Sequence, residues 1–143
     1  MLNNQHTKYI GIDYGKKRTG VSISDHNKVI SFPLDTIETS KLIIYLENLI
    51  PSENIEKVII GKPLKLKNQL HELENDIIQF IELLQSIFPH IMIERIDERY
   101  TSKISNLIIR QSGINKKSRM NKSIIDKISA SLILESYLIM TNK

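Results

Sequence analysis

Cysteine and tryptophan are both absent from this 143-residue sequence. Without cysteine the protein has no disulfide bonds and no thiolate metal ligands, which fits a reducing compartment. No apolar stretch approaches the roughly 18 residues that a membrane span needs, and the first residues lack the apolar core of a secretion signal. We therefore expect a cytoplasmic protein with no membrane partner.

The sequence also has no internal repeat, no low-complexity tract and no linker rich in glycine, serine or proline. Its few aromatic residues are too scattered to form a base-stacking platform, and its four histidines have no mutual spacing for a metal site or a catalytic dyad. The hydrophobic fraction of 41% and the charged fraction of 25% are ordinary for a globular protein. We expect a single domain over residues 1–143.

Hydrophobic alternation predicts three short N-terminal strands, at residues 9–12, 21–24 and 29–34. Their short connections favour an antiparallel meander. Helices with strands between them are expected to follow, in this order: helix 40–50, a strand at 58–60, helix 70–88, a strand from 91, helix 101–112 and helix 123–137. Ser40 is expected to cap the first of these helices, and Pro51 to stop it. This order predicts an α/β domain with a mixed sheet flanked by helices.

The net charge of +4 is unevenly distributed along the chain. Residues 38–94 carry nine acids and five bases, whereas residues 95–127 carry nine bases and three acids. Residues 1–24 carry four bases and one acid. Basic residues often only solvate surface loops, but two basic segments brought together would attract phosphate groups. The candidate phosphate contacts are Lys16, Lys17, Arg18, Arg99, Lys116, Lys117 and Arg119.

Four acids remain inside these basic segments: Asp13, Asp97, Glu98 and Asp126. Asp13 ends the first expected strand, and glycines such as Gly20 are expected to leave its carboxylate little covered. Asp97 and Glu98 end another strand, and Asp126 lies in the first turn of the last helix. Carboxylates that meet at one end of a sheet can hold Mg²⁺ or Mn²⁺. Two such ions about 3.5–4 Å apart would activate water for phosphodiester hydrolysis.

Each of these acids also has an alternative role that the spacing leaves open. Asp13 suits a turn, and Asp126 suits the positive end of a helix dipole. Asp97 and Glu98 are flanked by arginines and suit ion pairs with them. Acids this far apart in sequence carry no local ligand signature.

Four blocks of the chain, taken in order, resemble the motifs of one family. They are residues 10–25 (IGIDYGKKRTGVSISD), 58–64 (VIIGKPL), 97–101 (DERYT) and 125–138 (IDKISASLILESYL). They are similar to the YqgF or RuvX family of pre-16S ribosomal RNA nucleases, which are related to Holliday junction resolvases. The resemblance implies a ribonuclease-H-like fold with a five-stranded mixed sheet, in which three antiparallel N-terminal strands are followed by two parallel ones.

The resemblance also implies a catalytic set of Asp13, Asp126 and one acid of the Asp97–Glu98 pair. Related resolvases carry an acid at the end of the central strand, where this chain has Gly61, so the remaining ligand is expected from that pair. Neighbouring strand residues face opposite sides of a sheet, so one of the two faces the metal, and Glu98 is preferred. The loop at residues 65–69 lacks the acid and the glycine that are usual in the family, which leaves its geometry open.

The function implied is that of a nuclease in the 5′-end processing of pre-16S ribosomal RNA during ribosome biogenesis, with two Mg²⁺ or Mn²⁺ ions as cofactors. Structured RNA or branched DNA is the expected partner, for a monomer or a dimer. Two alternatives stay open: a resolvase-like nuclease for branched DNA, and a non-catalytic RNA-binding factor of ribosome assembly. Convergence of the carboxylates would favour an enzyme, whereas carboxylates that point apart would favour the binding factor.

Overall fold

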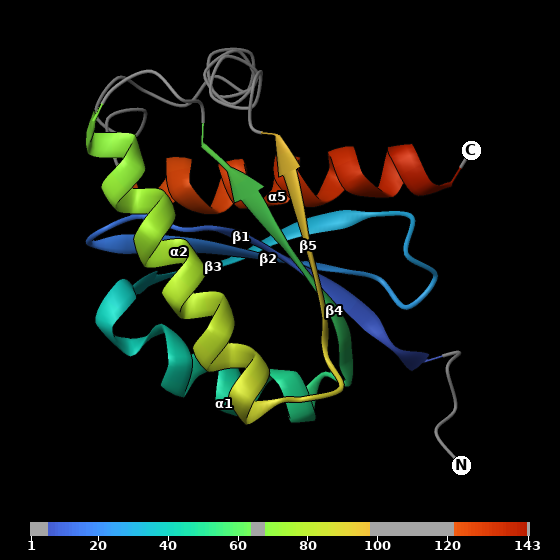
Figure 1. Cartoon of the computed structure of the whole chain (residues 1–143). Coiled ribbons are helices and arrows are strands. Elements are labelled where there is room, and N and C mark those ends of the chain that lie inside the picture. Colours follow the sequence, from blue (N-terminus) through green and yellow to red (C-terminus); the bar gives the residue numbers. More distant parts are fainter. Residues whose placement is uncertain (1–5, 64–67, 98–121, 143) are drawn as a thin grey trace.

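The computed structural model describes residues 6–63, 68–97 and 122–142. Five strands form one mixed sheet in the order β3-β2-β1-β4-β5 (Figure 1). The antiparallel part consists of β1 (Lys8–Asp13), β2 (Arg18–Ser24) and β3 (Ser31–Glu38). The strands β4 (Ile55–Lys62) and β5 (Met92–Asp97) run parallel to β1. The predicted mixed sheet of three antiparallel and two parallel strands is therefore confirmed.

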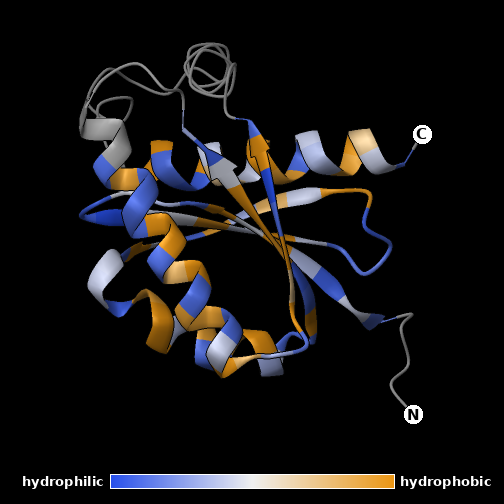
Figure 2. Cartoon of the chain, viewed as in Figure 1, coloured by the Kyte–Doolittle hydropathy of each residue, from blue (hydrophilic) through white to orange (hydrophobic). Residues whose placement is uncertain are grey.

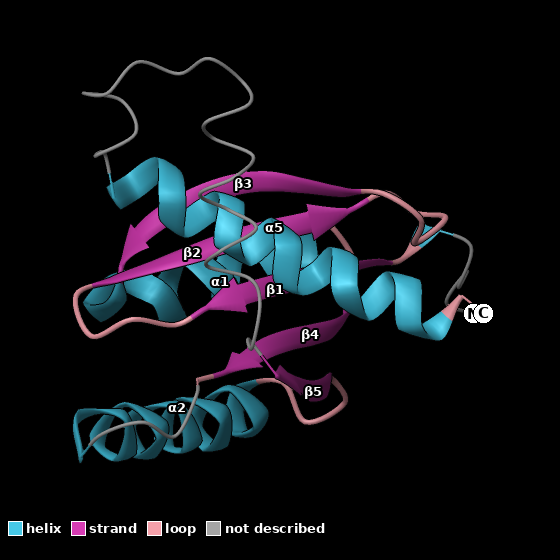
Figure 3. Cartoon of the chain, turned by 90° about the horizontal axis from the view of Figure 1, so that it is seen from above, coloured by secondary structure: helices cyan, strands magenta, loops and turns pink. Residues whose placement is uncertain are grey.

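Helices cover both faces of the sheet (Figure 3). On one face lie α1 (Leu42–Ser52) and α2 (Asn68–Ile87), and on the other lies α5 (Lys122–Thr141). None of the helices in the described parts of the chain is long and apolar enough to cross a lipid bilayer.

Alternation along the strands divides the core into two layers. Ile10 and Ile12 of β1 are fully buried against α1 and α2, together with Leu46 and Leu84 of those helices. The smaller second layer lies under α5, where Ile59 of β4 packs with apolar residues of the helix. Colouring by hydropathy shows the apolar sides of α1 and α2 turned toward the sheet (Figure 2). Side chains that alternate in sequence therefore contact different helices.

The third strand and the first helix begin later than the sequence predicts. The backbone N–H groups of Val29 and Ile30 both donate to Asp25 Oδ1 at 2.8 Å, which holds them in the β2–β3 turn, so β3 begins at Ser31. Ser40 does not cap α1, because it lies inside a short 3₁₀ turn, η2 (Thr39–Lys41). Pro51 lies in the last turn of α1 rather than beyond it. The helix predicted at 101–112 lies outside the described residues.

Helix α5 packs on the sheet through its backbone. A Cβ atom at Gly11 would lie 2.5 Å from Ser22 Oγ, 2.7 Å from the carbonyl oxygen of Ala130 and 2.8 Å from Leu134 Cβ. Three hydroxyl groups of β2 and β3 donate hydrogen bonds to carbonyl oxygens of the helix: Ser22 to Ala130, Ser31 to Ser131 and Thr36 to Ser123. A carbonyl oxygen has two lone pairs, so it accepts these bonds in addition to its helical one. Small and hydroxylated residues thus hold α5 closer to the sheet than large side chains would allow.

Among the described strands, β3 is an edge strand and pairs with β2 alone. The register between them shifts at Val21 and Ser22, which marks a bulge. Pro33 lies in the middle of this edge strand, and Phe32 and Leu34 beside it are exposed.

The close approach of α5 predicts that an added methyl group at Gly11 is costly. We expect Gly11→Ala to lower the free energy of unfolding by about 1–3 kcal/mol, because Ser22 or the α5 backbone must move. Urea denaturation measures the change. Ile44→Ala, at a side chain that is 65% exposed on α1, serves as the control and should shift stability by less than about 0.5 kcal/mol. A Gly11→Ala protein as stable as the wild type would contradict this account of the packing.

Candidate metal and nucleic-acid site

The functional candidates from several strands lie at the carboxyl ends of the parallel strands. We call this end of the sheet, which carries Asp13 and Asp97, the acidic edge. Because β1, β4 and β5 are parallel, their last residues, Asp13, Lys62 and Asp97, lie at the same edge. Strand β2 runs the opposite way and begins at this edge with Arg18. The sheet thus brings two of the predicted acids and one of the predicted bases to one end.

Asp13 and Asp126 occupy the same face at this edge. Asp13 pairs across the strands with Gly20, so both residues turn toward the α5 side of the sheet. A Cβ atom at Gly20 would overlap the backbone carbonyl of Asp126. The first turns of α5 therefore rest directly on the residue beside Asp13. Gly20 therefore makes room for the helix that carries Asp126, a role that the sequence did not predict.

Asp126 forms an ion pair with Arg18. Arg18 Nε donates a hydrogen bond to Asp126 Oδ2 at 3.1 Å. The Asp126 side chain is only 23% exposed, and the Arg18 side chain is 39% exposed. The guanidinium therefore lies against a proposed metal ligand instead of extending fully into solvent.

Asp97 turns toward the other face of the sheet. In β5, Ile96 packs with the apolar residues under α5. Arg95, on the opposite side, donates two hydrogen bonds to the carboxylate of Glu74 on α2, at 3.1 and 2.7 Å. Alternation gives Asp97 the same side as Arg95, away from Asp13. Gly61 of β4, buried beneath α5, supplies no carboxylate at the central strand.

Within residues 6–63, 68–97 and 122–142, no three carboxylate or imidazole side chains are close enough together to hold a metal ion. The remaining predicted ligand, Glu98, lies outside the described residues, as do Arg99, Lys116, Lys117 and Arg119. The described part of the site therefore contributes two carboxylates, from Asp13 and Asp126.

The basic loop between β1 and β2 is fixed by threonines. Thr39 Oγ1 donates to the carbonyl oxygen of Gly15 at 2.6 Å, and the N–H of Thr39 donates to the carbonyl oxygen of Lys17 at 2.9 Å. The hydroxyl of Thr19 lies 2.9 Å from that of Thr39. Sequence analysis did not identify Thr39, whose only sequence signal is its position just before a helix.

The three basic residues of this loop differ in their surroundings. Lys16 Nζ donates to Glu72 of α2 at 2.7 Å, and this hydrogen bond and the charge of Glu72 raise the pKa of Lys16 above its ordinary value. Arg18 is paired with Asp126. Lys17 is exposed, with no side-chain partner among the described residues. Of the three, Lys17 is the cation most available to a phosphate group.

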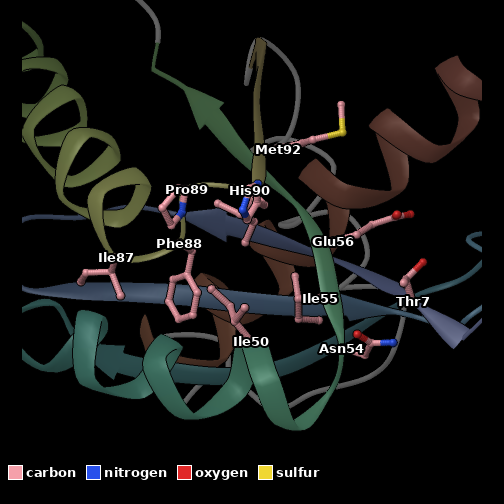
Figure 4. Close-up of a pocket in the computed structure, with 11 residues that line it drawn as sticks. Thr7, Ile50, Asn54, Ile55, Glu56, Ile87, Phe88, Pro89, His90 and Met92 are labelled. Atoms are coloured by element: carbon pink, nitrogen blue, oxygen red, sulfur yellow. The ribbon is translucent and has the colours of Figure 1, made fainter. Parts of the chain in front are cut away.

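A mainly apolar pocket lies at the opposite edge of the sheet (Figure 4). Its volume is about 380 Å³, and its walls come from the starts of β4 and β5 and the ends of α1 and α2. Ile50, Ile55 and Phe88 give it a mainly apolar lining, with Thr7 and His90 at its margin. Because Thr7 precedes β1 and Asp13 ends it, this pocket is separate from the acidic edge.

Comparison with known proteins identifies relatives over nearly the whole chain. Residues 7–140 match the model of the RuvX family, described as Holliday junction resolvase. A protein of Bacteroides fragilis named as a pre-16S rRNA nuclease is 37% identical over 132 residues, which span 92% of this chain and 96% of the relative. A Flavobacterium johnsoniae protein of the same name is 40% identical over 131 residues, 92% of this chain and 95% of the relative.

Solved structures of resolvases share the fold. The RuvC protein of T. thermophilus in complex with a Holliday junction superposes with a TM-score of 0.62 and 12% identity, covering 95% of this chain and 97% of that one. The Fowlpox virus resolvase, also solved with Holliday junction DNA, gives a TM-score of 0.55 and 15% identity, covering 95% of this chain and 99% of that one. These similarities confirm the ribonuclease-H-like fold.

The contact between Gly20 and Asp126 predicts that this glycine positions the acid. We expect Gly20→Ala to reduce nucleic-acid cleavage by about ten- to a hundredfold, because the added methyl group pushes Asp126 away from Asp13. Cleavage is measured well below the melting temperature of the variant. Gly11→Ala is the matched control, since it strains the same helix at Ala130 and Leu134, farther from Asp126. Equal losses in the two variants would mean that general destabilisation, and not the position of Asp126, lowers the activity.

Proposed function

This chain belongs to the RuvX family of Holliday junction resolvases, and we propose that it processes pre-16S ribosomal RNA with the help of divalent metal ions. Membership of this family makes the chain a nuclease, a hydrolase of phosphodiester bonds. The RNA substrate is proposed from the names of relatives that are 37–40% identical over 92% of the chain. Branched DNA is the second candidate, because the family description and the solved resolvase complexes both concern Holliday junctions. Those complexes share only 12–15% identity with this chain, so RNA is preferred.

The observation that carries the metal proposal is the common face of Asp13 and Asp126 at one edge of the sheet. Carboxylate oxygens are hard ligands, which suit Mg²⁺ or Mn²⁺. The imidazoles of His6, His26 and His90 belong to the opposite edge, at the starts of β1 and β5 and in the β2–β3 turn. The donors described at the acidic edge are carboxylates, which fit a magnesium-type ion better than zinc.

We propose Glu98 as the third ligand. Asp97 turns to the α2 side of the sheet. Strand alternation continued by one residue would give Glu98 the side on which Asp13 lies, which is the basis of this proposal. The catalytic set is then Asp13, Glu98 and Asp126, with Asp97 outside it.

The residues of this site have separate tasks in the proposed reaction. The three carboxylates hold the cation or cations, and a bound pair would activate a water molecule and stabilise the leaving oxygen. Lys17 attracts the phosphate backbone, and the threonines that fix the β1–β2 loop hold it at the acidic edge. The basic residues Arg99, Lys116, Lys117 and Arg119 are proposed as further contacts to the nucleic acid.

Replacement of Asp13 tests the mechanism directly. We expect Asp13→Asn to reduce cleavage by about three or more decades, because an amide oxygen is a weaker ligand for a hard cation. Asp126→Asn and Glu98→Gln should have comparable effects, whereas Asp97→Asn should remain active. Cleavage is measured on a pre-16S rRNA fragment and on a four-way DNA junction, with Mg²⁺, with Mn²⁺ and with EDTA.

Cleavage by Asp13→Asn at the wild-type rate would refute the metal mechanism, whatever the other variants do. Loss of activity in Asp97→Asn, but not in Glu98→Gln, would reverse the assignment of the third ligand. Faster cleavage of the junction than of the rRNA fragment would favour the DNA substrate. Binding of the RNA without cleavage under any metal condition would favour an assembly factor.

Lys17 is expected to contact phosphate. Its replacement by Gln should make the logarithmic salt dependence of RNA affinity shallower by about 0.7–0.9, which is the value for one lost contact. Fluorescence anisotropy in EDTA at several salt concentrations measures the slope. Lys8→Gln, which removes an equal charge at the opposite edge, is the control and should leave the slope unchanged. An unchanged slope in Lys17→Gln would mean that RNA does not bind at this loop.

A further inference from the structure

Arg18 and Asp126 form an ion pair at the place where a metal ion and a phosphate group are both proposed to bind. Their contact is a single hydrogen bond of 3.1 Å from Arg18 Nε. No other side-chain bond of either residue occurs within the described structure, so the terminal nitrogens of the guanidinium stay available. The side chain of Arg18 is 39% exposed, which leaves it room to turn outward.

This pair competes with both ligands that are proposed for the site. A cation bound to Asp126 is repelled by a guanidinium on the same carboxylate. An arginine held by a carboxylate is likewise a poor partner for a phosphate, because its charge is already compensated. The Arg18–Asp126 ion pair therefore competes with the metal ion for Asp126 and with the phosphate group for Arg18.

We propose that Arg18 couples metal binding to nucleic-acid binding by changing partners. In the metal-free protein Arg18 neutralises Asp126. When a divalent cation binds Asp126, the guanidinium is released and takes a phosphate of the nucleic acid. This inference rests on the proposed function and deepens it, since the metal-bound protein is then the form that binds nucleic acid more tightly.

The neighbouring lysines do not suit this role. Lys16 is bound to Glu72 on α2, which belongs to the other face of the sheet. Lys17 is exposed and has no bond to either proposed ligand carboxylate within the described residues. Among the described residues Arg18 links the acidic edge to the basic loop, because it starts β2, close to Gly20 and the α5 backbone.

The proposal has a reciprocal consequence for affinities. If metal binding favours nucleic-acid binding, nucleic acid must favour metal binding by the same factor. A partly exposed ion pair stabilises a protein by up to about 1 kcal/mol. Competition by Arg18 therefore weakens metal binding by a factor of up to about five.

The first experiment measures Mn²⁺ binding without nucleic acid, by electron paramagnetic resonance. Arg18→Gln removes the competitor, so the dissociation constant for Mn²⁺ should fall by about fivefold relative to wild type. Lys17→Gln is the matched control: it removes the same charge one residue away and should give a smaller change. Weaker Mn²⁺ binding in Arg18→Gln would overturn the proposal, because it would mean that Arg18 supports the metal site.

The second experiment measures the salt dependence of affinity for a fluorescent RNA hairpin, in EDTA and in Ca²⁺, after a gel has verified that the hairpin stays intact. Ca²⁺ should steepen the slope of the wild type by about 0.7–0.9, which corresponds to one added phosphate contact. In Arg18→Gln the slope should be the same in EDTA and in Ca²⁺. A slope in EDTA that is already shallower in Arg18→Gln than in the wild type would overturn the exchange, because Arg18 would then contact phosphate without metal.

Asp126→Asn tests the release of Arg18 without any metal. Its salt slope in EDTA should equal that of the wild type in Ca²⁺, and the double variant Asp126→Asn/Arg18→Gln should lose the added steepness. Equal slopes for Asp126→Asn and wild type in EDTA would overturn the inference. The proposed function fails in a different way: Mn²⁺ would then bind neither the wild type nor Arg18→Gln.

Discussion

Helix α5 meets the sheet through backbone atoms, and the position of one candidate catalytic acid follows from that contact. At Gly11 and Gly20 no side chain of β1 or β2 separates the strand from the backbone of the helix. The hydroxyls of Ser22 and Ser31 then bind carbonyl oxygens of the helix, so its position along the sheet is fixed as well as its distance. Apolar packing alone is non-directional and would fix this position less sharply. The acid on the helix is therefore located by residues that perform no chemistry themselves.

Side chains alternate along each strand, so the two faces of the sheet carry different residues: most of the core on one face and a candidate metal ligand on the other. The α1–α2 face carries most of the core. Near the acidic edge, the ion pair of Arg95 with Glu74 joins β5 to α2 on this face. The α5 face has a smaller core, and it carries Asp13 at its margin. A shift of one residue in the register of β5 would turn Asp97 from the α2 side of the sheet to the α5 side. The pairing of Lys62 with Asp97 thus keeps the Asp97 side chain on the face away from Asp13.

The sheet and most of its helices follow from local patterns in the sequence. The alternation at Val21–Ser24 and the apolar run at Val58–Ile60 correspond to β2 and β4. The start of β3 could not be predicted from hydrophobicity, because Val29 and Ile30 look like strand residues. They are bonded instead to the carboxylate of Asp25, and such a bond depends on the three-dimensional path of the turn.

The candidate site was less predictable than the fold. Strand ends and a family resemblance identify Asp13 and Asp126, since both signals are local. The partner of Arg18 was not predicted, because that residue and Asp126 are 108 positions apart and meet only through the packing of α5. The contact of Gly20 with Asp126 was not predicted for the same reason: a glycine leaves space, but the sequence does not say what fills it.

The composition of the β3 edge has a consequence for the behaviour of the chain at high concentration. An edge strand with exposed Phe32 and Leu34 invites another strand to pair with it, which is a common start of aggregation. Pro33 between them has no N–H group to offer to such a strand. The bulge next to it, where Leu34 is the extra residue of β3, twists the edge further from the flat shape that intermolecular sheets require. The β3 edge therefore exposes apolar residues and is still a poor template for the pairing of further strands.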